Sequence, residues 1–138
     1  MAAGYSQDVA GVQHPYTVTS NGMGGFTFTN MNPPGSTTGQ ATSINDAGKV
    51  GGFFTDALGV THGFLDSAGI FTPFDAPRAA FTQILGLNNL GQFVGDYTDA
   101  AAIHMDFSMP AQISSALMDS MGHGSEREHH RLSWHSNA

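Results

Sequence analysis

An internal repeat restricts the folds open to this chain more than any other feature of its sequence. Residues 44–56, INDAGKVGGFFTD, return as residues 87–99, LNNLGQFVGDYTD, after a shift of 43 residues. The same shift places Phe28 on Phe71, so the repeat extends beyond this motif. Repeats of about 20 to 50 residues are typical of propellers, solenoids and other arrays. In such arrays the repeat is scaffold, and function lies on the faces that the array exposes.

An earlier and incomplete copy precedes these two. At a shift of 48 residues, Gly4, Gly11 and His14 match Gly52, Gly59 and His62. The larger shift implies about five extra residues, which the glycine-rich loop at residues 20–25 is able to absorb.

The expected secondary structure is all-β. Turns that begin with Asn45, Asp56 and Asp66 each end in glycine, which adopts positive φ without strain. Glycine recurs too often for helices of ordinary length. This spacing predicts antiparallel four-stranded meander repeats of about 43 residues. The expected strands are residues 41–45, 49–55, 61–66 and 70–75 in one copy and 82–87, 92–98 and 103–108 in the next.

A four-stranded unit of this length matches one blade of a β-propeller. The predicted β-repeat region, residues 1–107, contains the last two strands of a partial blade at 4–30, a full unit at 41–75 and a partial unit at 82–108. Because a closed propeller needs at least about four blades, we expect a partial β-propeller-like array with uncovered strand edges. Such edges pair with other chains, which predicts a homo-oligomer or, alternatively, further repeats of a larger chain.

Composition excludes several classes of protein. The formal net charge is −7 and only four residues are Lys or Arg, which argues against a nucleic-acid partner. No apolar run has the length of a transmembrane segment, and without cysteine there is no disulfide or thiol chemistry. Residues 1–5 lack the basic stretch and apolar core of a signal peptide. Since Gly4 already lies within a repeat, we expect the chain to be a fragment or a truncated reading frame.

Two motifs occur in a fixed order in the full unit. INDAGKVGG at residues 44–52 is followed by THGFL at residues 61–65. This order resembles the HAF-type bacterial extracellular repeats, whose units carry IN-x-x-G-x-V-x-G and then HGFL or HAF. The resemblance covers residues from about 4 to 107, although the third copy reads IHMDF and lacks the glycine. It implies a β-propeller-like surface or secreted protein with a scaffold role, and it transfers no active-site residue.

Residues 108–138 form a tail of different composition. Ile113, Leu117 and Met121 lie four residues apart after Pro110, which predicts a short amphipathic helix, with disorder or a frameshifted segment as the alternatives. Imidazole is a common ligand of zinc, copper and nickel, so the histidines that follow are weak candidates for a metal site. Histidines in a polar terminal segment usually face solvent, and we therefore predict no metal and no cofactor. The four candidates are His123, His129, His130 and His135.

The recurring residues are expected to have structural roles. His14, His62 and His104 recur at or near one register, which indicates a ring nitrogen that ties a turn or neighbouring strands together, with a ligand-facing ring of histidines as the alternative. Turn carboxylates such as Asp46 and Asp56 supply one or two oxygens each, whereas calcium requires six to eight. The predicted structural residues of the repeat are Asn45, Gly48, Gly52, His62, Asn88, Gly91 and Gly95.

The chain shows no constellation of catalytic residues. No Gly-x-Ser-x-Gly elbow, phosphate-binding glycine loop or partnered carboxylate is present, so we predict that the protein is not an enzyme. The predicted function is a non-enzymatic extracellular or cell-surface β-repeat scaffold or protein-interaction module that self-associates. The alternative is a glycan-binding or small-molecule-binding propeller fragment in which exposed aromatic rings act as stacking platforms, although strand aromatics are more often core. The rings considered are Phe53, Phe54, Phe74 and Tyr97.

Overall fold

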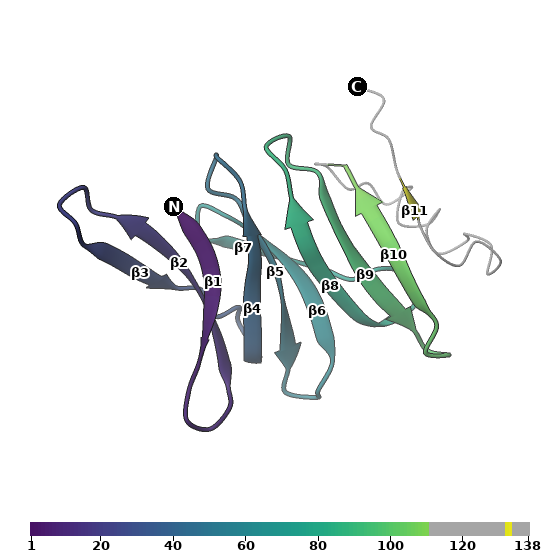
Figure 1. Cartoon of the computed structure of the whole chain (residues 1–138). Helices are drawn as coiled ribbons and strands as arrows, with labels where there is room; N and C mark the ends of the chain where they lie inside the picture. The colour runs from purple at the N-terminus through teal and green to yellow at the C-terminus, as the bar shows by residue number, and fades with distance from the viewer. Residues whose placement is uncertain (111–131, 134–138) are drawn as a thin grey trace.

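The computed structural model describes residues 1–110 and 132–133, and their regular structure is entirely β. Figure 1 shows the strands arranged broadly in a row, with the N-terminal strands at one end, the middle of the chain in the centre and the strands up to residue 109 towards the other end. Two open sheets result, and the described residues form no closed ring. The strands are β1 (Ala2–Gln7), β2 (Gln13–Ser20), β3 (Phe26–Asn30), β4 (Ser36–Ile44), β5 (Val50–Asp56), β6 (Thr61–Ser67), β7 (Ile70–Phe74), β8 (Ala79–Leu87), β9 (Phe93–Asp99), β10 (His104–Met109) and β11 (Leu132–Ser133).

The strands group into three consecutive units. Unit 1 is the three-stranded sheet β1-β2-β3, unit 2 is the meander β4 to β7, and unit 3 is the meander β8 to β10. Within each unit, neighbouring strands pair antiparallel. A single parallel bridge between Thr61 and Phe81 joins units 2 and 3 into one sheet, and β11, which pairs parallel to β10, is the eighth strand of that sheet.

The expected strands of units 2 and 3 are confirmed, with differences confined to their ends. The expectation of two strands in the first copy is wrong, because β1 supplies a third. Its sequence AAGYSQ is rich in small residues of low β propensity, and pairing with β2 determines its conformation. The expected helix at 110–121 falls almost entirely outside the described residues.

The register of unit 1 agrees with the two shifts in the sequence. Val18 pairs with Phe28 and Asp66 pairs with Phe71, so the shift is 48 residues on β2 and 43 on β3. The five residues 21–25 connect β2 to β3, whereas two residues connect β6 to β7. The insertion therefore lies in the glycine-rich loop, as the sequence predicts.

Most of the turns share one hydrogen-bonded design. The first residue accepts backbone N–H groups from positions two and four residues on, as Asp56 does from Leu58 and Val60 at 2.8 and 3.0 Å. The fourth residue has positive φ, for example +82° at Gly59. The turn that begins at Asp99 keeps the positive φ but has no glycine, because Ala102 occupies the fourth position with φ of 62°. A side chain in this region is strained by its Cβ atom.

We expect Ala102→Gly to stabilise the protein. Relief of the left-handed strain outweighs the extra entropy of an unfolded glycine, for a net gain of about 0.5 kcal/mol or more in the free energy of unfolding. Chemical denaturation measures this quantity. Ala101→Gly is the control, because the φ of Ala101 is not positive, and it should cost about 0.5 kcal/mol. Equal effects of the two changes would contradict the expectation.

The core consists of two clusters that occupy the same positions of the repeat. One lies between units 1 and 2 and the other between units 2 and 3. A shift of 43 residues superposes Met31, Ala41, Val50, Phe54 and Phe64 of the first cluster on Phe74, Ile84, Phe93, Tyr97 and Phe107 of the second. The repeat in the sequence is therefore a repeat of one packing interface.

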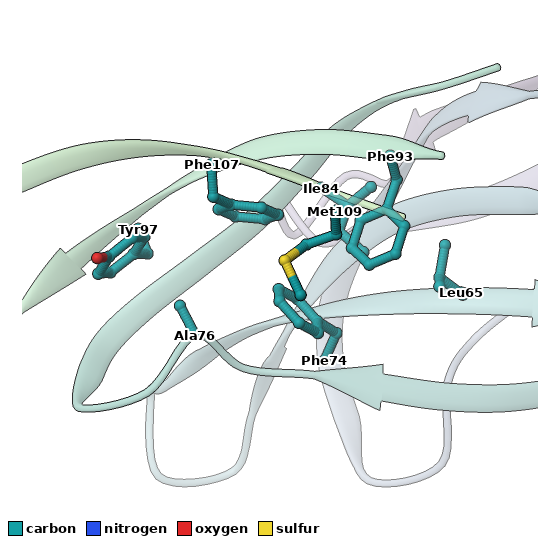
Figure 2. Close-up of a cluster of buried hydrophobic side chains, with 8 residues drawn as sticks. All are labelled: Leu65, Phe74, Ala76, Ile84, Phe93, Tyr97, Phe107 and Met109. Carbon is teal, nitrogen blue, oxygen red and sulfur yellow. The ribbon is translucent and has the colours of Figure 1, made fainter. Parts of the chain in front are cut away.

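Phe74 links two units through this interface. Figure 2 shows its ring reaching from β7 towards Phe107 and Met109 of unit 3. Its centroid lies 5.2 Å from those of both Phe93 and Phe107, distances typical of favourable aromatic pairs. Burial of one phenylalanine contributes about 2 kcal/mol, more than an exposed ion pair at about 0.5 kcal/mol. Apolar burial therefore dominates the contact between units.

A glycine lies beneath each central aromatic ring. A Cβ atom on Gly52 would approach the Phe64 ring to 2.8 Å and would overlap the Gln40 carbonyl oxygen. Gly95 has the same relation to Phe107 and Gln83. Strands β4 and β8 carry register irregularities near these glycines, between Ala41 and Ser43 and between Ile84 and Gly86. We call β4 and β8, the first strands of units 2 and 3, the inner strands. Each inner strand approaches too closely for any side chain at the glycine position of its unit.

Gly52→Ala is expected to lower the free energy of unfolding by about 3 kcal/mol or more, because backbone and ring must both move. Gly4 is the matched control, since its hypothetical Cβ meets only the Tyr16 side chain at 3.3 Å or more. Gly4→Ala should cost less than about 1 kcal/mol. Similar losses for both variants in chemical denaturation would show that the close inner strand is not the cause.

Candidate functional site

Unit 1 presents an uncovered face at the start of the array. Tyr16 lies over Gly4 as Phe64 lies over Gly52, so the aromatic and glycine pair occurs here too. Phe64 is fully buried, whereas Tyr16 is only half-buried and its neighbour Phe28 is 64% exposed. The interface positions of the repeat are thus present in unit 1, and none of the described units covers them.

This face holds a shallow pocket of about 390 Å³. The rings of Tyr16 and Phe28 meet edge to face with their centroids 5.3 Å apart. Polar groups from all three strands surround the rings. We call the surface formed by Ser6, His14, Tyr16, Phe28 and Asn30 the open face.

The other end of the array presents a different surface. Unit 2 receives Ile84 of unit 3 above Gly51 and Gly63, where a Cβ atom would lie 2.9 and 3.1 Å from the isoleucine side chain. In unit 3 the position of Gly51 is taken by Val94, which is 46% exposed beside Leu85 at 47%. Val94 would therefore obstruct a following unit that carried an isoleucine at this position. We call the surface around Leu85 and Val94 the end face.

Each unit contains one histidine that contacts a carboxylate. His14 lies 3.0 Å from Asp8, and His62 lies 2.9 Å from Asp56, in both cases through Nε2. In units 1 and 2 the partner is the first residue of a turn, so the ring braces the turn. In unit 3 the spacing is one residue shorter, and His104 instead lies 2.9 Å from Asp96 on the neighbouring strand.

His62 contacts two carboxylates at once. Its Nδ1 lies 2.8 Å from Asp75 while its Nε2 lies 2.9 Å from Asp56. Partial burial lowers the pKa of His62, but the hydrogen bonds to Asp56 and Asp75 outweigh it and raise the pKa above the usual 6.5. The hydrogen bond from His62 lowers the pKa of Asp56 below 3.8. Both shifts favour the ion pair, because two ring nitrogens that face carboxylates both need a proton.

The stability contributed by this pair should depend on pH. A raised histidine pKa gives stability that is fully present below about pH 6.5 and is lost as the pH rises through the folded pKa. A lowered carboxyl pKa gives stability that is lost as the pH falls through the folded pKa, below 3.8. The melting temperature difference between the native chain and His62→Gln should therefore be larger near pH 5.5 than near pH 8.5.

Asp75→Asn provides the control for this measurement. It removes one of the two charges that hold the proton on His62, so the pH dependence should begin to disappear at a lower pH than in the native chain. A melting temperature difference for His62→Gln that is constant with pH would show that the ring acts only by packing.

Several predicted structural residues connect equivalent turns of neighbouring units. The Asn45 side chain accepts the Lys49 N–H at 2.9 Å and donates to the Asn88 carbonyl oxygen at 3.2 Å. One residue on, Asn89 donates to the Asp46 carboxylate at 2.7 Å and accepts the Asp46 N–H at 2.8 Å. Asn45 and Asn88 are 43 residues apart, and so are Asp46 and Asn89, so copies of one position contact each other directly. Asn88 donates instead to Gln92 at 2.8 Å, within its own turn.

The remaining predicted residues divide between the structural roles above and the undescribed tail. Gly48 and Gly91 have φ of +80° and +79° and close their turns, and Gly52 and Gly95 lie beneath the aromatic rings. Among the described residues, no three His, Asp or Glu side chains are grouped so that they could hold a metal ion. The candidates His123, His129, His130 and His135 lie outside the described residues.

The proposed stacking platforms are not exposed aromatic surfaces. Phe54, Phe74 and Tyr97 are buried at 8, 4 and 4% exposure, and Phe53 is half-buried. Core packing between units accounts for these rings. The open face was missed by sequence reasoning, although the 48-residue shift that places Tyr16 on Phe64 contained the signal for it.

Comparisons with protein-family models, with curated proteins and with solved structures gave no match. No helix capable of crossing a membrane occurs in the part of the chain that the structure describes.

Proposed function

We propose that this protein is a non-enzymatic β-repeat scaffold that associates by adding further repeat units to its ends. The observation that supports this proposal is the interface shared by units 1, 2 and 3, which uses the same positions of the repeat twice. The open face carries the corresponding positions of unit 1, including the ring of Tyr16 over Gly4.

The two ends lack complementary strands. Among the described residues, unit 1 has no equivalent of the inner strand β4, and in unit 3 the place of β7 holds only the two residues of β11. When the end face of one copy stacks on the open face of another, Val94 meets unit 1 of that other copy. Its described residues include no inner strand that could clash with Val94. Association would cover Leu85, Val94 and Phe28, which are exposed in the single chain. Further repeats of a longer chain would serve the same purpose.

The partial β-propeller-like arrangement and the cellular location belong to the same proposal. Units of about 43 residues with four strands have the size of propeller blades. The motifs INDAGKVGG and THGFL resemble the HAF-type extracellular repeats, which supports a location outside the cell or on its surface.

Ser6→Lys tests the end-to-end arrangement. Ser6 is exposed on the open face, so a lysine there leaves the core intact but places a charge where a second copy would bury it. We expect sedimentation velocity to show association of the native chain at micromolar concentration and at least about tenfold weaker association of the variant.

Gln7→Lys is the matched control. It adds the same charge one position further along β1, where the side chain points to the opposite side of the sheet. Its association should equal that of the native chain. A native chain that remains a stable monomer, or equal association of both variants, would contradict the proposal.

A second candidate function rests on the chemistry of the open face. Two aromatic rings flanked by Ser6, His14 and Asn30 combine an apolar platform with hydrogen-bonding groups, which suits a sugar ring. A glycan array that gives no signal with the native chain, under conditions where it is monomeric, would remove this candidate.

A further inference from the structure

Strand β3 forms an edge of the unit 1 sheet. It is the last strand in the order β1-β2-β3, and Figure 1 shows it as the outermost strand at the N-terminal end of the array. All five of its residues are exposed, with Phe26 and Phe28 at 67 and 64%. Two large apolar side chains on an exposed edge strand are unusual, because such edges template pairing with other chains.

The backbone groups of β3 alternate between β2 and the open edge. The Met31 N–H donates to the Pro15 carbonyl oxygen at 2.9 Å, and the Asn21 N–H donates to the Gly25 carbonyl oxygen at 3.0 Å. Hydrogen-bonded pairs of an antiparallel ladder recur at every second residue. Thr27 and Thr29 therefore face β2, whereas Phe26, Phe28 and Asn30 direct their N–H and C=O groups towards the open edge.

The equivalent strand of unit 2 is protected against pairing. Asn30 corresponds to Pro73 of β7 at the shift of 43 residues, and β7 is likewise an edge strand that pairs with β6. Proline has no N–H to donate and is one of the residues that protect natural sheet edges. Charged residues are another such device, but residues 9–45 contain no Asp, Glu, Lys or Arg. β3 therefore lacks both forms of protection.

We infer that β3 pairs antiparallel with β3 of a second copy of this chain about a two-fold axis at Phe28. In this register Phe28 lies opposite Phe28 of the second copy, and Phe26 lies opposite its Asn30. All three outward-facing residues of each strand then form backbone hydrogen bonds. Because paired residues share a face, the rings of Phe28 and Tyr16 continue into those of the second copy. This inference rests on the proposed self-association. It differs from the end-to-end arrangement in using the backbone edge of β3, although Phe28 and Asn30 also belong to the open face.

A second copy is a better occupant than a charged peptide. The strand FTFTN is uncharged, alternates phenylalanine with threonine and is complementary to itself under a two-fold rotation. A peptide with Glu or Asp opposite Phe28 would leave a negative charge against two aromatic rings without an ionic partner in β3.

Asn30→Pro tests the edge directly. The change removes one outward N–H, and Pro73 shows that the repeat accommodates proline at this position. We expect the dissociation constant of the edge dimer, measured by sedimentation equilibrium, to rise at least about tenfold. The melting temperature of the monomer should fall only slightly, because proline also removes the exposed hydrogen bond of 3.1 Å that the Asn30 side chain accepts from the Asn32 N–H. Asn30→Ser is the control, because it alters the side chain but keeps the N–H. Native-like association of Asn30→Pro would overturn the inference.

A charge-pair experiment tests the register and does not depend on proline. Phe28→Lys and Phe28→Glu should each be impaired in association, because like charges would face each other across the two-fold axis. An equimolar mixture of the two should recover association as a heterodimer. A mixture that associates no better than either variant alone would overturn the inference.

The two sets of variants separate this inference from the proposed function. Loss of association in Ser6→Lys together with native association in Asn30→Pro would support the end-to-end scaffold and refute edge pairing. The opposite pattern would support edge pairing and refute the end-to-end arrangement. A native chain that is monomeric at all concentrations would refute both.

Discussion

The contact between an aromatic ring and a strand glycine organises each repeat unit. Phe64 over Gly52 and Phe107 over Gly95 depend on an inner strand that approaches the glycine too closely for a Cβ atom. The ring then presents its apolar surface to the preceding unit, whose Met31 or Phe74 packs into the same cluster. One small residue thus determines how close the strands approach and where the ring lies, and these two properties define the interface between units.

The open face contains the same contact between a ring and a glycine, but none of the described units covers it. Tyr16 lies over Gly4, but among the described residues no inner strand and no other unit covers this side of unit 1, so the rings of Tyr16 and Phe28 are accessible. Burial of these rings is worth more than the exposed ion pairs of the histidines, which act within turns.

Local chemistry explains which parts of the fold could be predicted. Asp56 and Asn88 accept backbone N–H groups within their own turns, and Gly59 and Gly91 take the positive φ that these turns require. These interactions span four residues or fewer, so the turns and the strands between them were readable from sequence. β1 was not, because AAGYSQ has no local preference for a strand and owes its conformation to β2.

By itself, the sequence determined the repeat, its all-β character and its turns, since these depend on residue type and on neighbours along the chain. Only the tertiary structure decided that Phe54, Phe74 and Tyr97 are core while Phe26 and Phe28 are exposed. The physical reason is that burial depends on what lies across the interface. Equivalent rings have equal local sequence patterns, but unit 2 covers unit 3 and unit 1 covers unit 2, whereas no described residue covers the open face.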